Sequence, residues 1–539
     1  MYPVNLTNSY FPGQADDEVR PTTVGGILSD AARAMPNSPA LVEAHADGSM
    51  GRAWTYEELL AAAMRQAAFL AARFAPGERI AVWSPNTPEW AILEFAAAMA
   101  GLTLVTVNPA YQARELHYVL KQSRAAGLFL VREHRGNPMA SIARDVCAEL
   151  PQIRVIVDLD DRMLPDAAQT CALPTVMPDD AAQIQYTSGT TGFPKGAMLS
   201  HRSVTNNSRF ILARMGVRTG DAFLNVMPMF HTSGCAAAML GSVQWGCRLI
   251  MVRQFDPQTA NFIIESQRVN LTMAVPTMLS GMLETHARTR RDISSLRVIL
   301  SGGAMVPPEL VRNVADKFGC KLVVIFGQTE TSPGLTQTRT DDSFEDRTDT
   351  VGQAFPRTEL SIRDVETNSV VPVGTVGEIC ARGYCNMIGY NDDAVATSRT
   401  IDAEGWLHTG DLGAIDARGY LRVRGRVKDM IIRGGENLYP AEIENVLVTH
   451  PAVAEAAVVG VPDQKWGEIA VCFLRVNAGT TAPSQRELIA HVRKDLAAPK
   501  TPAHWFFVEQ FPMTASGKIQ KFVLRERYLA GEFADAVVT

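Results

Sequence analysis

Residues 186–196 read YTSGTTGFPKG, a run with three glycines, three threonines, one serine and one lysine. An expected strand, 182–186, leads into it. Glycine lets backbone N–H groups approach a phosphate closely, hydroxyls add uncharged donors, and Lys195 adds a mobile positive charge. The run lacks the GxxxxGK[ST] spacing of a Walker A loop, and surface turns can share its composition. We therefore expect a flexible phosphate-binding clasp, with a surface hairpin or linker as the alternative.

Helix and strand patterns alternate on both sides of this loop, which favours an α/β fold built in layers. The N-terminal part predicts a helix over 56–73, then strands over 79–84 and 103–107 with an Ala-rich helix between them. A second strand–helix–strand unit is expected over 296–326. Its helix starts at two prolines and ends at a glycine, which is typical of helix termini.

The chain of 539 residues is too long for one ordinary core, so roughly two to four domains are expected. From about residue 351, short strands with Gly, Pro and Asp turns predict a β-rich region, and a compact α+β tail follows residue 426. We expect a large N-terminal domain, 1–427, of layered α/β subdomains plus a β-rich subdomain. A small, mobile α+β C-terminal domain, 428–539, completes the prediction.

Composition excludes several classes of protein. The net charge of −6 is small for this length and argues against a nucleic-acid binder. Eight cysteines are scattered without metal-ligand spacing, which favours a reduced, cytoplasmic protein. The N-terminus has no signal-peptide pattern, and the most apolar windows, 95–107 and 234–252, are too short or too polar to span a bilayer. No transmembrane segment is expected.

Six further motifs follow the loop in order: PMFHTSG (228–234), SGGA (301–304), FGQTE (326–330), WLHTGD (406–411), GRVKDMIIRGGENLYP (425–440) and PMTASGK (512–518). Together with the loop, they resemble the adenylate-forming (AMP-binding) superfamily of acyl-CoA synthetases, nonribosomal adenylation domains and beetle luciferases. The resemblance covers nearly the whole chain. It implies an ATP-dependent acid–CoA ligase of the acyl-CoA synthetase branch.

The implied reaction converts a carboxylic acid, ATP and coenzyme A into acyl-CoA, AMP and pyrophosphate through a bound acyl-adenylate. Because a carboxylate and a triphosphate are both anions, the site needs cations and hydrogen-bond donors aimed at the developing charge. The resemblance implies ATP and Mg²⁺, with coenzyme A as a substrate. The expected partners are these small molecules and no nucleic acid, with homodimer formation left open.

The resemblance assigns the nucleotide site residue by residue. Lys518 would present its ammonium to the carboxylate and the α-phosphate, Glu330 would hold Mg²⁺, and Thr329 would donate to phosphates. Asp411 would accept the ribose hydroxyls, with Arg426 on the same side. The other expected ATP-binding residues are Thr187, Ser188, Gly189, Thr190, Thr191, Gly192, Lys195, Gly302, Gly303, Ala304, Phe326, Gly327 and Gln328.

Each of these residues has an ordinary structural alternative. A lone lysine such as Lys518 is usually a solvated surface charge. An acid such as Glu330 often lies at a helix N-terminus, and an Asp after Thr-Gly, such as Asp411, is most often a turn residue.

His231 is implied to line the acyl pocket and to act in catalysis at the entry of the thiol, with Gly234, Cys235 and Val275 also in the pocket. Amino-acid-activating relatives tend to carry Asp in this region to pair with the substrate ammonium. The chain has His231 instead, so the resemblance predicts an acid without an α-amine. A medium-chain or branched fatty acid is expected first and an aryl acid second.

The motif at 425–440 is implied to control domain movement. Lys428 would be the hinge about which the C-terminal domain rotates between the two half-reactions, and Gly434 and Gly435 would line the path of the thiol. Luciferases carry a lysine where Ile432 stands, which argues against light production. Two alternatives remain: an enzyme that loads a carrier-protein phosphopantetheine, and a non-catalytic protein on the same fold.

Overall fold

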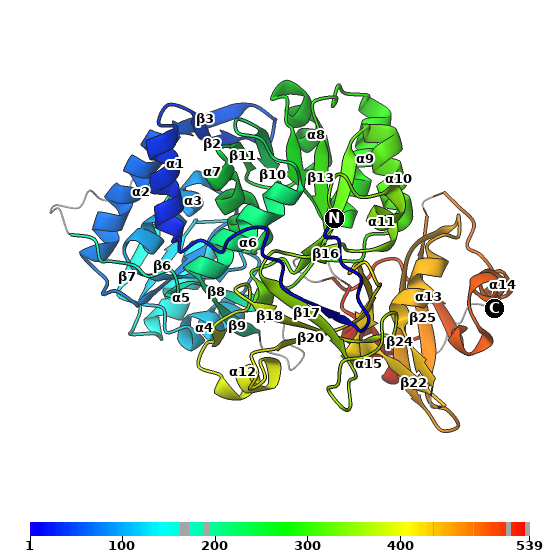
Figure 1. Ribbon diagram of the computed structural model, residues 1–539. Coiled ribbons are helices and arrows are strands. Elements are labelled where there is room, and N and C mark those ends of the chain that lie inside the picture. Colours follow the sequence, from blue (N-terminus) through cyan, green and yellow to red (C-terminus); the bar gives the residue numbers. More distant parts are fainter. Residues whose placement is uncertain (162–171, 188–193, 435, 478, 514–518, 534–539) are drawn as a thin grey trace.

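The computed structural model describes residues 1–161, 172–187, 194–434, 436–477, 479–513 and 519–533. Figure 1 shows two large helix-covered regions, a smaller β-rich region beneath them, and a C-terminal lobe at one side. The arrangement confirms the predicted fold class of a large layered α/β part with a β-rich subdomain and a small α+β tail. Among the described residues, no helix is long and apolar enough to cross a membrane.

The sheet that carries residues 186 and 187 has seven strands in the order β19-β9-β8-β5-β4-β6-β7. The pairs from β8 through β5, β4 and β6 to β7 are parallel, whereas β9 pairs antiparallel with both β8 and β19. Its strands are β4 (Arg79–Trp83), β5 (Thr103–Val107), β6 (Gly127–Leu130), β7 (Val155–Asp158), β8 (Ala181–Thr187), β9 (Lys195–Ser200) and β19 (Gly389–Tyr390). The strands predicted over 79–84 and 103–107 are confirmed.

The second large sheet has nine strands in the order β16-β15-β14-β13-β12-β10-β11-β2-β3. The six strands from β14 to β2 are parallel to one another, whereas β15 and β3 pair antiparallel with the two ends of this set. Its strands are β2 (Pro39–Ala44), β3 (Met50–Thr55), β10 (Ala222–Asn225), β11 (Arg248–Val252), β12 (Leu271–Met273), β13 (Val298–Ser301), β14 (Lys321–Phe326), β15 (Thr336–Gln337) and β16 (Gln353–Ala354). The predicted unit over 296–326 is confirmed as β13, helix α10 and β14.

One core fills the space between the two sheets, and a second lies on the far face of the nine-stranded sheet. Successive side chains of a strand point to opposite faces, so Phe223 joins the first core and Leu224 the second. The helices of this part are α1 (Val24–Ala34), α2 (Tyr56–Ala71), α3 (Pro88–Met99), α4 (Ala113–Gln122), α5 (Met139–Ala148), α6 (His201–Arg214), a π-helix (Ser233–Leu240), α7 (Gly241–Trp245), α8 (Pro257–Ser266), α9 (Pro276–Thr289), α10 (Pro308–Phe318) and α11 (Phe344–Asp349).

Local sequence explains where these helices begin. Helix α2, predicted over 56–73, begins after a capping box in which the Thr55 side chain accepts the N–H of Glu58 and the Glu58 side chain accepts that of Thr55. Helices α3, α8, α9 and α10 each carry proline in the first turn, where its missing N–H costs no helical hydrogen bond.

The β-rich subdomain is an antiparallel sheet in the order β1-β17-β18-β20-β21. Its strands are β1 (Tyr10–Phe11), β17 (Thr358–Arg363), β18 (Gly377–Gly383), β20 (Leu407–Ile415) and β21 (Leu421–Arg426), and the short helix α12 (Ala394–Thr400) lies beside it in sequence. The predicted change of texture near residue 351 is therefore confirmed.

The C-terminal part builds its own sheet, β23-β22-β25-β24 with β26 beside β25. Its elements are β22 (Ile431–Arg433), β23 (Glu436–Leu438), α13 (Pro440–Leu447), β24 (Val453–Asp463), β25 (Gly467–Val476), α14 (Gln485–Asp495), β26 (His504–Phe507) and α15 (Lys521–Leu529). Two buried clusters consist only of residues from Ile431 onward, and three consist only of residues up to Val423. The hydrophobic cores therefore separate between these two positions.

Candidate active site

Strands β8 and β9 form the base of the YTSGTTGFPKG loop. Thr187 pairs with Lys195 at the last described position of this hairpin, which fits the hairpin alternative as well as the clasp. The loop residues Ser188, Gly189, Thr190, Thr191 and Gly192 lie outside the described residues. The Lys195 ammonium lies 5.0 Å from the centre of the Tyr390 ring, within the range of a cation–π contact. Tyr390 reaches this position because β19 pairs with β9.

Glu330 lies in a 3₁₀ turn, Thr329–Thr331, shortly after strand β14. It is only 8% exposed, and its Oε1 accepts a hydrogen bond from the Tyr390 hydroxyl at 2.8 Å. Burial and the neighbouring carboxylate raise the pKa of Tyr390, so this hydroxyl stays protonated and donates. Thr329, equally buried, precedes Glu330. Glu330, Tyr390 and Lys195 therefore form one polar group beside the loop.

A buried glutamate fits a magnesium ion, because Mg²⁺ prefers hard oxygen ligands. Tyr390 engages only Oε1 of Glu330 in the bond given above. The tyrosine thus fixes the carboxylate through one oxygen, and the second oxygen is the candidate ligand.

Three adjacent parallel strands end at the same edge of the nine-stranded sheet, where ligands of open α/β sheets bind. The segment after β12 contributes Val275, and the segment after β13 contributes Gly302, Gly303 and Ala304. A Cβ at Gly303 would lie 3.8 Å from Val275 Cγ1. The segment after β14 contributes Gly327. Predicted adenine-side and acyl-side residues therefore meet at one edge, together with Phe326 and Gln328.

Two of these glycines are required by packing alone. A Cβ at Gly302 would lie 2.5 Å from the carbonyl oxygen of Ile325, and one at Gly327 would lie 2.1 Å from that of Pro333. Gly303 has a φ of +76°, which favours glycine. The Gly-Gly of residues 302–303 thus has a structural reason before any nucleotide binds.

Asp411 and Arg426 pair across strands β20 and β21, with Arg426 Nε 3.3 Å from Asp411 Oδ1. The structure thus brings together the two residues assigned to the ribose side. Lys428 lies in the next turn, Val427–Asp429, and is exposed overall. Partial desolvation of its ammonium and then the charge of Arg426 lower the pKa of Lys428.

His231 lies just before the π-helix Ser233–Leu240, and its Nδ1 is 3.0 Å from Ser233 Oγ. The Ser233 backbone N–H also donates to this nitrogen at 3.2 Å, so Nδ1 is the acceptor and Nε2 carries the proton of the neutral ring. Gly234 is required by packing, because a Cβ there would lie 2.3 Å from the Pro228 carbonyl oxygen. A π-helix often marks a functional site.

Cys235 is fully buried, with its sulfur 3.1 Å from Gln185 Nε2. Gln185 in turn donates to Gln183, which hydrogen-bonds to buried Glu94. Burial raises the pKa of the Cys235 thiol, so it is not a nucleophile at neutral pH. The predicted pocket residue therefore belongs to a buried polar network in this structure.

On the C-terminal side, Gly434 has a φ of +60° and donates its N–H to the Trp466 carbonyl at 2.7 Å. A Cβ at Gly434 would lie 2.9 Å from the Trp466 ring. The close indole gives this glycine a packing role as well as its predicted place on the thiol path. Gly435 and Lys518 lie outside the described residues.

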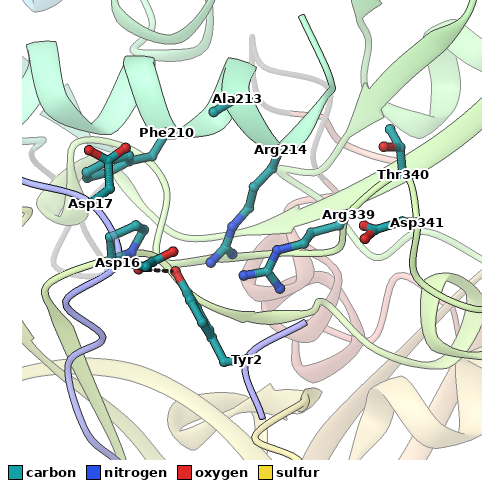
Figure 2. Close-up of a pocket in the computed structure, with 10 residues that line it drawn as sticks. Tyr2, Asp16, Asp17, Phe210, Ala213, Arg214, Arg339, Thr340 and Asp341 are labelled. Carbon is teal, nitrogen blue, oxygen red and sulfur yellow. Dashed lines mark hydrogen bonds between the residues drawn. The ribbon is translucent and has the colours of Figure 1, made fainter.

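A separate cavity of about 240 Å³ lies where the N-terminal segment meets the end of α6 (Figure 2). Arg214 and Arg339 both point into it, close to the Tyr2 ring. Arg214 donates to the backbone carbonyls of Gln337, Gln353 and Ala354. These hydrogen bonds hold strands β15 and β16 at the edge of the nine-stranded sheet. Of the residues predicted for the active site, none that the structure describes lines this cavity.

Sequence reasoning missed Tyr390. Its only local signal is the dipeptide Gly389-Tyr390, and its contact with Glu330 spans 60 positions in the chain. Glu378, which accepts the Gly410 N–H, and His408, which contacts Glu378, were missed as well. His408 lies inside the WLHTGD motif, and this position in the motif could have identified it as a candidate.

Comparison with known proteins gives consistent matches. The family model described as AMP-binding enzyme matches residues 28–391, and that of the AMP-binding enzyme C-terminal domain matches 442–518. A putative acyl-CoA synthetase, YngI of Bacillus subtilis, is 38% identical over 94% of this chain and 97% of its own length. The mitochondrial medium-chain acyl-CoA ligase ACSF2 of Rattus norvegicus is 35% identical over 96% and 89%. The crystal structure of ATP-bound MatB from Rhodopseudomonas palustris superposes with a TM-score of 0.83 at 29% identity, covering 94% and 99%.

Proposed function

The chain belongs to the AMP-binding enzyme family and is an AMP-forming acyl-CoA ligase, and we propose that it activates a medium-chain or branched fatty acid with ATP and transfers it to coenzyme A. The observation that carries the nucleotide half of the proposal is the buried group of Glu330, Tyr390 and Lys195 beside the loop. A buried carboxylate and a nearby cation support the binding of a triphosphate together with its metal.

In the first half-reaction, a carboxylate oxygen of the acid attacks the α-phosphorus of ATP, and the bond to the β-phosphate oxygen breaks to release pyrophosphate. Lys195 and the loop hold the β- and γ-phosphates, and Lys518 neutralises the charge where the two anions meet. Asp411 accepts the ribose hydroxyls. Glu330 would hold a magnesium ion, which would supply further charge neutralisation for the phosphates.

In the second half-reaction, the thiol sulfur of coenzyme A attacks the acyl carbon. The bond from that carbon to the AMP oxygen breaks, AMP leaves, and the thiol gives up its proton. The mixed anhydride makes this possible because AMP is a far better leaving group than the oxide of a free carboxylate. In this proposal the C-terminal domain rotates between the two steps. Lys518 is at the site for the first step, and the segment around Gly434 is there for the second.

The proposed domain boundary at residue 427 is supported by the separation of the hydrophobic cores between Val423 and Ile431. Lys428 lies within this gap, in a single 3₁₀ turn between strands β21 and β22. A turn that shares no core with either side can change its backbone angles at low energetic cost. These features support Lys428 as the hinge.

The proposed acid follows from the pocket segment. Residues 234–240 are Gly, Cys, three Ala, Met and Leu, so the segment offers small, apolar side chains and no partner for an ammonium or a second carboxylate. The similar proteins include a medium-chain acyl-CoA ligase, which agrees with this choice. An aryl acid is the second candidate, and a carrier-protein phosphopantetheine is the alternative acceptor.

The experiment is a carboxylic-acid panel read by pyrophosphate release with and without coenzyme A. The proposal predicts turnover with medium-chain acids that rises strongly when coenzyme A is present. Turnover confined to aryl acids would replace the proposed substrate, and turnover supported only by a phosphopantetheinylated carrier protein would replace the acceptor.

A further inference from the structure

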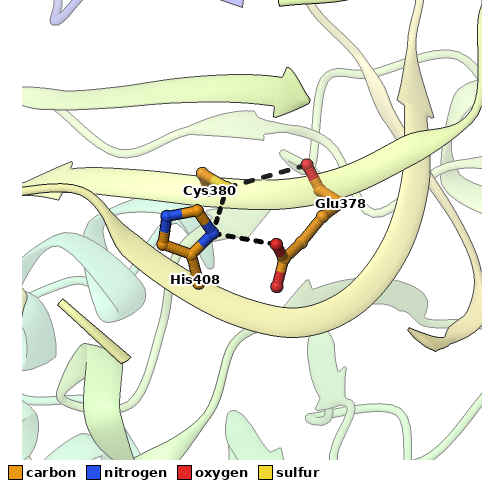
Figure 3. Close-up of side chains that lie close together, drawn as sticks. All are labelled: Glu378, Cys380 and His408. Carbon is orange, nitrogen blue, oxygen red and sulfur yellow. Dashed lines mark hydrogen bonds and ion pairs between the residues drawn. The ribbon is translucent and has the colours of Figure 1, made fainter. Parts of the chain in front are cut away.

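Glu378 and His408 lie side by side (Figure 3), and His408 directly precedes the turn Thr409-Gly410-Asp411 in sequence. Glu378 comes from β18 and His408 from the neighbouring β20. The pairing of these strands shifts register between Glu378 and Cys380. An irregularity of this kind changes the direction in which nearby side chains point. His408 Nδ1 is 2.8 Å from Glu378 Oε2 and 3.5 Å from Cys380 Sγ.

The same glutamate holds the turn itself. Its Oε1 accepts the Gly410 N–H at 3.0 Å, and Gly410 has a φ of +70°. Thr409 Oγ1 donates to the Ile379 carbonyl at 2.7 Å and accepts the Asp411 N–H at 3.1 Å. Side-chain hydrogen bonds therefore fix each of the two residues before Asp411.

His408 is held between two carboxylates. Its Nδ1 faces Glu378, and its Nε2 is 3.5 Å from Asp402 Oδ2. Arg363, on the neighbouring strand β17, approaches the same Asp402 at 4.0 Å. A carboxylate facing each ring nitrogen favours the imidazolium form of the ring. Contacts with Cys380 and Glu378 raise the pKa of His408 to about 10.

A metal site is the competing interpretation, since ligand atoms of Glu378, Cys380 and His408 lie within 4.8 Å of one another. Atoms that share a tetrahedral zinc ion lie roughly 3.4 Å apart, given zinc–ligand bonds of about 2.1 Å. The 2.8 Å between His408 and Glu378 is instead a hydrogen-bond distance. Burial also raises the pKa of the Cys380 thiol, whereas a metal needs a thiolate and a neutral imidazole. The geometry favours an ion pair.

We propose that Glu378 and His408 are positioning residues that set the conformation of the Thr409-Gly410-Asp411 turn, so that recognition of the nucleotide ribose depends on them. The inference rests on the proposed function, because it takes Asp411 as the acceptor of the ribose hydroxyls. Glu378 acts on the turn through the Gly410 N–H, and His408 fixes Glu378. Neither residue needs to touch the nucleotide.

The test compares kcat/KM for ATP with kcat/KM for 3′-deoxy-ATP. Because both values come from the same enzyme preparation, the folded fraction cancels in their ratio. A hydrogen bond to a charged acceptor predicts that the intact protein prefers ATP by about 10- to 100-fold. Glu378→Ala is expected to reduce this preference at least fivefold. Glu378→Gln keeps an oxygen for Gly410 and is expected to retain part of it.

Glu359→Gln is the matched control, because Glu359 is a partly buried glutamate of the neighbouring strand β17 that pairs with Arg382 at 2.8 Å. It should leave the preference unchanged. His408→Gln, a milder change that keeps a donor toward Glu378, should lower the preference less than Glu378→Ala. If neither Glu378→Ala nor His408→Gln alters it, the positioning role is wrong.

Two further arms separate the possible failures. Asp411→Asn should remove most of the preference, and a preference that survives this change would overturn the ribose assignment itself. Loss with Asp411→Asn but not with Glu378→Ala would overturn only the positioning role. Cys380→Ala should have no effect, and a stoichiometric zinc ion in the purified protein, lost in this variant, would establish the metal site instead.

Discussion

The hydroxyl of Tyr390 donates to Glu330 Oε1 at 2.8 Å, and both residues are only 8% exposed. Tyr390→Phe removes this one donor and leaves the ring under Lys195 in place. A buried hydrogen bond to a charged group contributes about 1.5–3 kcal/mol. Water can reach part of the vacated position in such a variant, so we take the lower end of this range. About 1.5 kcal/mol corresponds to roughly a 12-fold loss in kcat/KM for ATP.

The assay is pyrophosphate release at several ATP and Mg²⁺ concentrations. The expected result is a loss in kcat/KM for ATP together with a higher Mg²⁺ requirement, because the carboxylate that holds the metal has lost its orienting partner. KM for the acid should change little. Tyr420→Phe is a matched control, since Tyr420 is buried and its hydroxyl donates to the Asp342 carboxylate at 2.6 Å in the β-rich region.

The comparison between the two variants is decisive. If Tyr390→Phe and Tyr420→Phe have the same kcat/KM for ATP and the same Mg²⁺ dependence, the Glu330–Tyr390 bond has no special role in binding the nucleotide. The assignment of Glu330 as the residue that holds the metal would then be wrong.

Four other changes have defined outcomes. Gly327→Ala, whose Cβ would lie 2.1 Å from a backbone carbonyl, should lower the thermal midpoint by several degrees, whereas Gly281→Ala, with its nearest neighbour at 3.6 Å, should not. Lys428→Pro should slow thioester formation more than adenylate formation, and unchanged thioesterification would place the hinge elsewhere. Lys518→Ala should abolish most adenylation yet spare thiol transfer from supplied acyl-adenylate, and equal loss of both would contradict its role. The pKa of His408, raised from 6.5 to about 10, means that its stabilisation is complete below pH 6.5 and lost as pH rises through about 10. The difference in urea midpoint between the wild type and His408→Gln should therefore shrink over that range, and a constant difference would contradict it.

The sequence was informative where a local pattern and a long motif agreed. Helix α2 and strands β4 and β5 follow from periodicity and capping residues, because those signals lie within one element. Glu330 was singled out by its motif, and the structure gives it a buried polar environment. The hydrogen bonds of Asp411 to its neighbours were not predicted, since they depend on the register of β18 against β20.

Other features could not be predicted for physical reasons. Tyr390 reaches Glu330 only because β19 pairs antiparallel with β9. The paired residues are about 190 positions apart in the sequence, so no local pattern predicts the pairing. The apolar window 234–252 begins as a π-helix, and a Cβ at Gly234 would lie 2.3 Å from the Pro228 carbonyl oxygen. Helical periodicity does not distinguish this geometry from an α-helix.

The proposed substrate of this acyl-CoA ligase is a medium-chain or branched fatty acid. The most direct measurement is a competition reaction in which butyrate, octanoate, a branched octanoate, palmitate and benzoate are present together with ATP, Mg²⁺ and coenzyme A. Mass spectrometry of the thioesters then gives the relative kcat/KM of the acids in one experiment. We expect octanoyl-CoA or its branched isomer to dominate, with one AMP formed per thioester. Dominance of benzoyl-CoA or palmitoyl-CoA would contradict it.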